Sequence, residues 1–274
     1  MSDQKDNPLP HLGFQLIKPS ANLACYIQSY WFMQTEHLDA VDTNEYLHPD
    51  GGMSIIFNYS DKLQFNDGSP VGDCIFDGVN TTTKSLTLKG RFNTVGIRFH
   101  PAGASAFLST PLNEYKNELI SLTDTAFKNQ AELYHQLPEI PTVESKVAFI
   151  EKWLVRTLLP ENKHTPLMQA SLRLINQHHG SLQIATLAAR LETNQRRIER
   201  LFNAQVGITA KEMARNIRVK HARHYMKKNP QLALADIAHD LGFYDQAHFN
   251  HQFKQVVGIS PKVYTAKSQA VPKR

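Results

Sequence analysis

Two arginines and one glutamate stand at helical spacing in the stretch QRRIERLFNAQ, residues 195–205, and their side chains could read the edges of nucleic-acid bases. The planar guanidinium of arginine matches the paired O6 and N7 acceptors of guanine. Arg196 and Arg200 are one helical turn apart, so both side chains can enter the same groove. Glu199 lies between them and could accept a hydrogen bond from cytosine N4, or could orient one of the arginines.

A helix and a turn must precede this stretch if its side chains are to be held in place. Residues 184–191 are rich in alanine and carry apolar side chains at the spacing of one helix face. Asn194 is a residue type that favours the helix N-cap, and Ile198 and Phe202 form an apolar stripe opposite the arginines. The sequence therefore predicts a helix-turn-helix unit at about 184–205, with one face on a core and the other free.

The same pattern occurs a second time in residues 234–260, LADIAHDLGFYDQAHFNHQFKQVVGIS. The offset between the copies is 50 residues from Leu191 to Leu241 and 51 from Gly207 to Gly258, so the second turn contains one inserted residue. A repeat of this length is usually one supersecondary unit used twice. The second unit, at about 234–257, adds further candidates for base contacts on its outer helix face, namely Gln246, His248, Asn250 and His251.

A basic stretch, residues 210–229, joins the two copies. As a single helix it would be about 30 Å long, close to the roughly 34–36 Å between successive major grooves on one side of B-DNA. We interpret it as a linker helix that spaces two recognition helices, and a plain basic connector is the alternative. Candidates for phosphate contacts are Arg197, Lys211, Lys254 and Lys262. A solvated helix face without DNA contact is the alternative for every one of these residues.

Two such units in tandem, with LGFYDQAHFNHQFKQVVGISPKVY at residues 241–264, resemble the DNA-binding domain of the AraC family of transcription regulators from residue 166 to about 267. The resemblance implies that the second helix of each unit enters the major groove. Two positions depart from the family pattern. Glu192 stands where the first turn often has glycine, so that turn is expected to be strained or differently shaped. Ala210 stands where the second copy has Pro261.

Charge is divided unequally along the chain of 274 residues, whose length favours two domains, 1–160 and 161–274. From residue 166 onward there are 17 Lys and Arg and 6 Asp and Glu, whereas the preceding part has 13 basic and 19 acidic residues. The second domain therefore suits a polyanion such as double-stranded DNA.

The first domain is expected to be rich in β-structure, as a small antiparallel β barrel or sandwich with helices. The second is expected to be all-α, with two helix-turn-helix units joined by a long helix. The fold class of the whole protein is therefore α+β. Residues 1–13 are expected to be a loose tail, 23–33 a strand or a short helix, 36–44 a connection, and 160–165 the joint between domains. Strands are predicted at 53–59, 63–65, 74–76, 85–89 and 94–99, with a turn at 66–70. Helices are predicted at 104–109, 126–137, 143–158 and 166–178.

Residues 47–59 and 95–108 resemble a sensor-type domain that is fused to AraC-type domains in many bacterial regulators, which implies effector binding but no particular ligand. Five aromatic side chains could line an effector pocket or could fill the core: Tyr30, Trp31, Phe57, Tyr59 and Phe99. His48, Asp50 and His100 could suggest a metal site, but no His-x-His occurs before residue 166, so turn chemistry is the favoured interpretation. We expect no metal, cofactor or catalytic residue.

The sequence thus predicts a sequence-specific regulator of transcription rather than an enzyme. A DNA-repair enzyme with a similar targeting domain would need a cluster of nucleophilic or zinc-binding cysteines, and the chain has only Cys25 and Cys74, which we expect to be buried structural thiols. A non-specific DNA binder would not need Glu199 in a groove. Expected partners are double-stranded DNA, RNA polymerase, an unknown small-molecule or protein effector, and a second copy through the N-terminal domain or helices 126–158. The polar N-terminus and the lack of a long apolar run favour a cytoplasmic protein without membrane contact.

Overall fold

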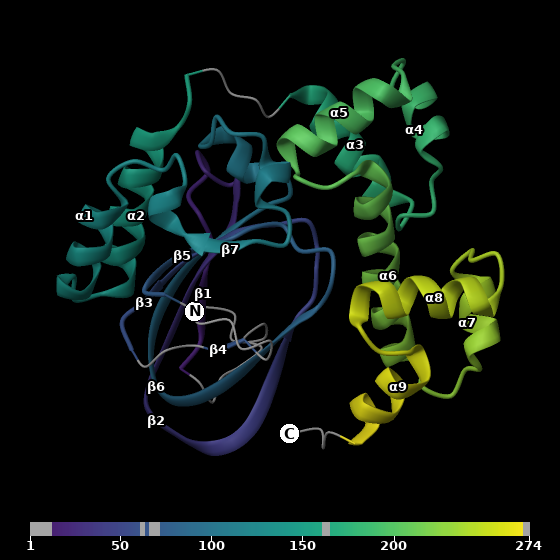
Figure 1. The fold of residues 1–274 in the computed structure, drawn as a ribbon, viewed down its shortest axis with the longest axis horizontal. Helices are drawn as coiled ribbons and strands as arrows, with labels where there is room; N and C mark the ends of the chain where they lie inside the picture. The colour runs from purple at the N-terminus through teal and green to yellow at the C-terminus, as the bar shows by residue number, and fades with distance from the viewer. Residues whose placement is uncertain (1–12, 61–63, 66–71, 161–164, 271–274) are drawn as a thin grey trace.

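The computed structural model describes residues 13–60, 64–65, 72–160 and 165–270. The whole expected turn at 66–70, the expected tail except Gly13, and most of the expected joint lie outside these residues. Within them, no helix has both the length and the apolar composition needed to cross a membrane. Figure 1 shows a sheet with short helices beside a group of helices that forms the C-terminal part, which confirms the α+β class.

The described strands form one antiparallel sheet in the order β1-β2-β6-β3-β5-β7, with β4 paired to β6. It is a single curved sheet in Figure 1, so the barrel-like alternative describes it better than two stacked sheets. The strand bounds are β1 Gln15–Ile17, β2 Ile27–Leu47, β3 Ser54–Asn58, β4 Gln64–Phe65, β5 Cys74–Asp77, β6 Lys84–Phe99 and β7 Leu119–Ser121.

Two long strands correct the sequence-based assignment. Residues 36–44 continue β2 instead of forming a connection, and the separate strands expected at 85–89 and 94–99 are both part of β6. The two strands pair from Ile27 with Phe99 to Leu47 with Lys84, with register shifts between Ile27 and Ser29 and again between Thr35 and Thr43. Polar residues can extend a strand where a neighbouring strand pairs with their backbone N–H and C=O groups. The composition of residues 36–44 alone does not reveal that neighbouring strand.

Short helices follow the sheet. The helix expected at 104–109 is the 3-10 helix η3, Gly103–Ala106, and the helix expected at 126–137 is shorter, α1, Gln130–Gln136. The helix at 143–158 is confirmed as α2, Val143–Thr157, with Thr142 as its N-cap. Further 3-10 turns, which the sequence did not predict, are η4, Leu112–Tyr115, η5, Leu122–Asp124, and η6, Leu137–Glu139.

The described C-terminal part consists of helices joined by turns and short loops, without a strand. Its helices are α3 Pro166–Gln177, α4 Ile184–Arg190, α5 Gln195–Gln205, α6 Ala210–Lys228, α7 Leu234–Asp240, α8 Gln246–Val257 and α9 Pro261–Ala270. After α3 the chain turns at Gly180, whose φ is +73° and whose N–H donates to the Ile175 carbonyl at 2.8 Å. This is a helix stop of the kind that glycine favours.

Buried apolar side chains fall into two main clusters. The larger one extends without a break from the sheet, through Phe107 and Leu112, to Ile198 and Phe202 of α5 and Met213 of α6. The second contains Phe249 and Phe253 of α8 together with residues of α6, α7 and α9. The first helix-turn-helix unit therefore shares its core with the N-terminal domain, whereas the second unit has a core of its own.

Candidate nucleic-acid interface

The first recognition helix, α5, has the two faces that the sequence predicts. Asn194 caps it and accepts a hydrogen bond from the Arg197 N–H at 2.8 Å. Ile198 and Phe202 are fully buried, and Glu199 is half-buried. The arginine side chains on the outer face, Arg196, Arg197 and Arg200, are exposed. Helix α5 is thus anchored by one stripe and presents three guanidinium groups on the other side.

The turn before α5 is strained at Glu192, as expected. Glu192 has a φ of +50°, in the left-handed region that costs a side chain about 1–2 kcal/mol. Gly242 occupies the equivalent position with a φ of +67°. The two turns also share a backbone hydrogen bond, from Thr193 to the Ala188 carbonyl at 3.0 Å and from Phe243 to the Ala238 carbonyl at 2.9 Å. Glutamate therefore adopts the glycine conformation of the repeat instead of changing the turn.

The second recognition helix, α8, is capped by Asp245, which accepts from the His248 N–H at 2.7 Å. Its buried stripe contains Phe249, Phe253, Val256 and Val257. Among the predicted candidates on this helix, Gln246, His251 and Lys254 are exposed. These three side chains have free access to solvent on the side away from the core.

Two other candidates on α8 are less open. The ring of His248 is half-buried, lies edge-on to Phe243 at 5.9 Å, and has its Nε2 2.6 Å from the Gln252 amide nitrogen. Asn250 is also half-buried, and its Oδ1 has no hydrogen-bond partner among the described residues. Base reading by His248 and Asn250 stays a prediction, and it would require His248 to leave its packed position.

One exposed residue near α8 was not among the predicted candidates. Tyr244 is 92% exposed and stands immediately before the cap of α8. It is the residue inserted into the second turn, since Thr193 matches Phe243 while Asn194 matches Asp245. The single-residue offset of the repeat was the available signal, because it marks Tyr244 as the one position of the second turn without a counterpart in the first turn.

Helix α6 fixes the two units relative to each other. Its first turn has a capping box in which Thr209 and Glu212 exchange hydrogen bonds, and its 19 residues correspond to about 28 Å. The Arg218 guanidinium donates to the Gly180 carbonyl, in the turn just before the first unit, at 2.7 Å and lies over the Phe243 ring of the second unit at 5.3 Å. Arg215 adds a hydrogen bond to Gln255 of α8 at 3.1 Å. The long linker helix is confirmed, and Arg215 and Arg218 tie it to the neighbouring segments.

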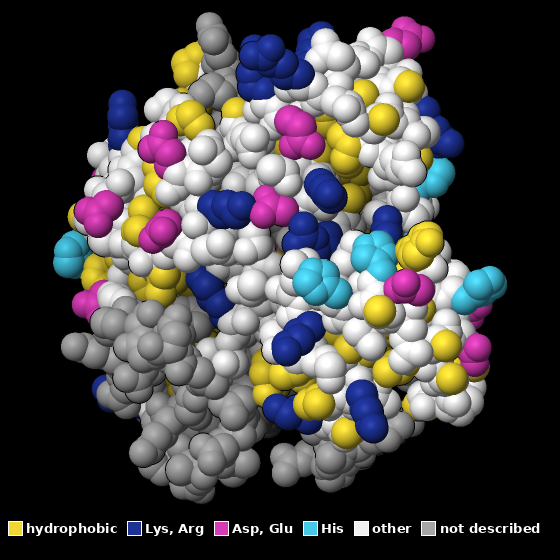
Figure 2. Space-filling view, turned by 45° about the vertical axis from the view of Figure 1, so that its right-hand side comes forward, with side chains coloured by type: hydrophobic (Ala, Val, Ile, Leu, Met, Phe, Trp, Pro, Cys, Tyr) yellow, Lys and Arg dark blue, Asp and Glu magenta, His cyan; other side chains and the backbone are white. Residues whose placement is uncertain are grey.

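The phosphate candidates are all exposed. Lys211 and Lys262 lie in the first turns of α6 and α9, where free backbone N–H groups favour an anion. Lys211, His248 and His251 line one groove of about 480 Å³ between the two units. Figure 2 shows blue Lys and Arg side chains interspersed with cyan His side chains over this helical part. A positive surface thus accompanies the recognition helices.

The outer face of α5 lies against the N-terminal domain. Arg196, Glu199 and Arg200 form one side of a groove of about 690 Å³ whose other side contains Pro111 and Asn113. Helix α5 also packs against η3 and η4. The base-reading candidates of the first unit therefore share their free space with a segment of the N-terminal domain.

Three further contacts hold the domains together. Thr83 donates from its N–H and from its Oγ1 to the Val256 carbonyl at the end of α8, at 2.8 and 2.9 Å. Lys116 forms an ion pair of 2.8 Å with Glu212 of α6. Burial alone would raise the pKa of Glu212, but the hydrogen bonds from Lys116 and Thr209 hold that pKa below its ordinary value. The N-terminal domain thus contacts both units and the helix between them.

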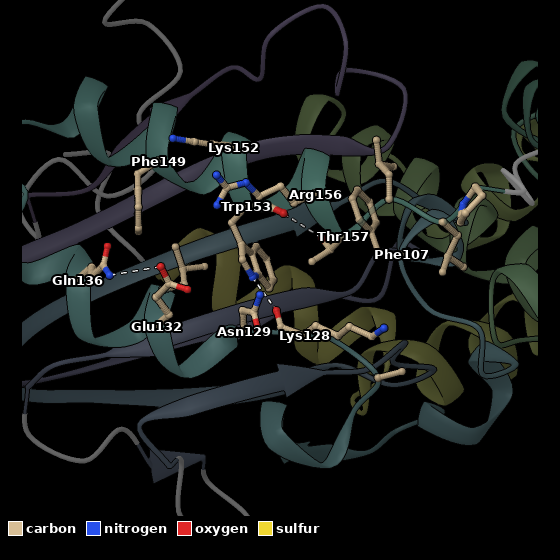
Figure 3. Close-up of a pocket in the computed structure, with 15 residues that line it drawn as sticks. Phe107, Lys128, Asn129, Glu132, Gln136, Phe149, Lys152, Trp153, Arg156 and Thr157 are labelled. Carbon is tan, nitrogen blue, oxygen red and sulfur yellow. Dashed lines mark hydrogen bonds between the residues drawn. The ribbon is translucent and has the colours of Figure 1, made fainter.

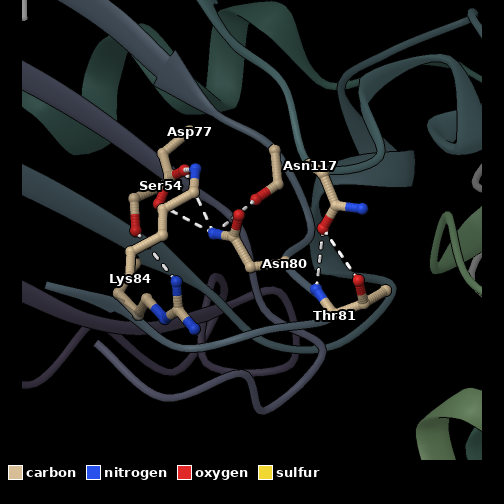
Figure 4. Close-up of polar contacts among 8 residues, drawn as sticks. Ser54, Asp77, Asn80, Thr81, Lys84 and Asn117 are labelled. Atoms are coloured by element: carbon tan, nitrogen blue, oxygen red, sulfur yellow. Dashed lines mark hydrogen bonds and ion pairs between the residues drawn. The ribbon is translucent and has the colours of Figure 1, made fainter. Parts of the chain in front are cut away.

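A polar network shapes the segment that carries Thr83 (Figure 4). The buried carboxylate of Asp77 accepts from Lys84 at 2.9 Å and from the Asn80 amide at 3.1 Å. The Thr81 N–H donates to the Asn117 side-chain oxygen at 2.8 Å. Because these bonds fix both ends of the turn between β5 and β6, the turn is a rigid support for the Val256 carbonyl.

Other predicted residues of the N-terminal domain have ordinary structural surroundings. Tyr30, Phe57 and Phe99 are fully buried in the main core, the alternative that the sequence left open, and Tyr59 packs against that core. Trp31 stacks on Phe14 at 6.1 Å, on a separate small cluster. None of the five lines either groove beside the helix-turn-helix units, and their effector role stays a prediction.

The His-Pro-Asp-Gly-Gly segment is a turn, as the sequence favoured. Asp50 accepts from the Gly52 N–H at 2.9 Å and pairs with Arg98. His48 lies with its Nδ1 2.8 Å from the Thr83 hydroxyl.

The expectation of two buried thiols is wrong in part, because Cys25 is exposed and Cys74 is half-buried.

Two protein-family models match the chain. One is described as a helix-turn-helix domain and matches residues 187–267, and the other, a domain of unknown function (DUF6597), matches residues 15–121. Among curated relatives, the Msm operon regulatory protein of Streptococcus mutans is 27% identical over 60% of this chain and 52% of its own length. The arabinose operon regulatory protein of Escherichia coli is 24% identical over 44% of this chain and 43% of its own length.

This chain therefore spans about half the length of those relatives. Among solved structures, ToxT from Vibrio cholerae aligns with 86% of this chain and 98% of its own, at 15% identity and a TM-score of 0.46. The matches in sequence lie where α4 to α9 form the two capped helix-turn-helix units. The chain carries the tandem helix-turn-helix domain of the AraC family, behind an N-terminal domain that belongs to a family of unknown function.

Proposed function

We propose that this protein is a sequence-specific, double-stranded-DNA-binding regulator of transcription, acting in the cytoplasm. One observation carries the proposal: α6 braces two capped recognition helices, α5 and α8, that expose hydrogen-bond donors on their outer faces. A rigid spacer of about 28 Å suits two helices that enter adjacent major grooves. Non-specific binding would need the positive charge alone, whereas Arg196 and Arg200 provide the forked donors that guanine recognition uses.

The regulatory part of the proposal is assigned to the N-terminal domain. Its contacts with Val256, Glu212 and the groove beside α5 give it a physical route to both recognition helices. An effector, or a second copy of the chain, would change DNA binding by favouring or disfavouring this docked arrangement. RNA polymerase is the partner through which the bound regulator would act.

The proposal is tested by selection of genomic DNA fragments with the purified full-length protein at about 150 mM salt. The expected result is an enriched motif, bound at least a hundredfold more tightly than random DNA, which is modest for a specific DNA-binding protein. The salt dependence of both affinities is measured, because counterion release should dominate binding to random DNA. If the protein binds random DNA but no motif is enriched, or if an enriched motif is bound no more tightly than random DNA with the same salt slope, the protein is a non-specific binder and the proposal fails.

A further inference from the structure

A cavity of about 650 Å³ lies in the N-terminal domain between α1, α2 and the chain that leaves α2 (Figure 3). Its lining includes no residue of the helix-turn-helix units. The volume falls in the range of about 300–1,000 Å³ that is usual for small-molecule sites. We propose that this cavity binds an aromatic carboxylate. Its role as the effector site rests on the proposed function, whereas binding itself does not.

The floor of the cavity is aromatic and fixed in place. Trp153 is 7% exposed, stacks on Phe127 at 5.6 Å, and donates from its indole N–H to the Lys128 carbonyl at 2.8 Å. Figure 3 shows the Trp153 ring in the middle of the lining, between Phe149 and Phe107. Aromatic pairs stabilise each other by about 0.5–1.5 kcal/mol beyond the area they bury. An aromatic ring of a ligand can therefore pack on the fixed Trp153 ring with this additional stabilisation, which an aliphatic chain would not gain.

The rim of the cavity is positive. Lys128, Lys152 and Arg156 line it, and none of the three forms an ion pair with any residue that the structure describes. Lys152 and Arg156 are one turn apart on α2, so they reach the same part of the rim. The one acid of the lining, Glu132, accepts a hydrogen bond from the Gln136 amide at 3.4 Å, drawn as a dashed line in Figure 3. The three cations and one acid favour a ligand with a carboxylate, which arginine can bind through two parallel hydrogen bonds.

The cavity is connected to the first recognition helix through a short path. Phe107 lines it, and the neighbouring Ala106 is the last residue of η3. The Leu159 N–H, also at the cavity, donates to the Ala106 carbonyl at 2.9 Å. Because η3 packs against α5, a ligand that moves Phe107 or Leu159 would move the surface on which α5 rests.

Tryptophan fluorescence provides a direct test, since the chain has only Trp31 and Trp153. In a Trp31→Phe variant of the full chain, Trp153 is the sole reporter. Titration with 3-phenylpropanoate should change its emission saturably, and the uncharged 3-phenylpropanamide should bind at least tenfold more weakly. A second measurement needs no variant: the acid, and not the amide, should raise the melting temperature of the natural protein.

Variants of exposed cations test the role of the rim, with one cation outside the cavity as the control. Lys152→Gln combined with Arg156→Gln should weaken binding of the acid at least tenfold, while Lys146→Gln, on the same helix but outside the cavity, should leave it unchanged. Equal binding of acid and amide, no effect of the double variant, or octanoate binding as tightly as 3-phenylpropanoate would overturn the assignment. Failure of the protein to bind DNA would count against the proposed function and leave this fluorescence result standing.

Discussion

At the scale of single residues, the outer face of α5 is the most informative feature. Its three arginines are exposed and spaced by the helix, and Glu199 lies half-buried between them. A forked donor that reads guanine should contribute to the choice of sequence, whereas a phosphate contact should contribute equally on every sequence.

Replacement of Arg200 by alanine tests this difference. We expect Arg200→Ala to weaken binding to the selected motif by roughly 1–3 kcal/mol and to relax the preference at one base position. Competition binding against motif variants measures both effects. Arg173→Ala, an exposed arginine of α3 away from the recognition helices, is the matched control. An equal loss on random DNA would make Arg200 a phosphate contact.

At the scale of elements, the two helix-turn-helix units differ in one turn position. Glu192 and Gly242 share the left-handed conformation and the surrounding hydrogen bonds, but only glycine adopts it without strain. A Cβ added at Gly242 would meet no atom within 4 Å, so any effect of adding one there reports the backbone conformation alone.

We therefore expect Glu192→Gly to stabilise the protein by about 0.5–1 kcal/mol and Gly242→Ala to destabilise it by about 1 kcal/mol. Urea denaturation of the full chain measures both changes. Loss of stability in Glu192→Gly would mean that the glutamate side chain makes a contribution larger than the strain of its backbone.

Sequence reasoning succeeded best where a pattern was both local and repeated. The caps Asn194 and Asp245, the buried stripes of α5 and α8 and the extent of α6 all follow from residue types at fixed spacing. The path of β2 through residues 36–44 did not, because its strand character depends on pairing with β6, half a domain away in the chain. The packing of His248 against Phe243 was likewise hidden, since a helix face alone does not show what lies beside it.

At the scale of the whole molecule, the docked arrangement of the two domains is the main finding. The contacts at Val256 and Glu212, and the core shared with the first unit, hold the helical part against the sheet. Pro111 and Asn113 line the same groove as Arg196 and Arg200, the proposed guanine-reading residues. The major groove is about 12 Å wide, so the backbones on both of its sides must pass close to α5.

Loosening of this arrangement should favour DNA binding. We expect Thr83→Val combined with Lys116→Gln to raise the affinity for the selected motif about fivefold, the equivalent of about 1 kcal/mol. The double variant removes the hydrogen bond from the Thr83 hydroxyl to Val256, the contact of that hydroxyl with His48 Nδ1, and the ion pair with Glu212. Lys146→Gln is the control for a change in charge. A lower or unchanged affinity would indicate that the docked form already binds DNA.

Acid should loosen the same interface through His48. Burial, with the charges of Arg223 and Lys227, lowers the pKa of His48 to about 3, against an ordinary value near 6.5. Between those values the undocked or unfolded chain binds a proton at His48 that the docked form does not, so stability falls as pH decreases from about 6.5 toward 3. His48→Asn keeps a polar group near Thr83 and removes the titration.

Urea denaturation between pH 7.5 and 5 measures this effect. We expect the natural protein to lose stability with a steeper slope than His48→Asn, while the other histidines contribute equally in both. Identical slopes would show that His48 titrates in the same way in the folded and unfolded chains.

The most direct test of the central claim, that two recognition helices enter adjacent major grooves, is protection of guanine N7 from methylation on the selected DNA site. This position lies in the major groove, where α5 and α8 are proposed to bind. We expect two protected segments about 10 base pairs apart on one side of the duplex, with Arg200→Ala exposing guanine in one of them. A single protected segment, or protection of the minor groove alone, would contradict it.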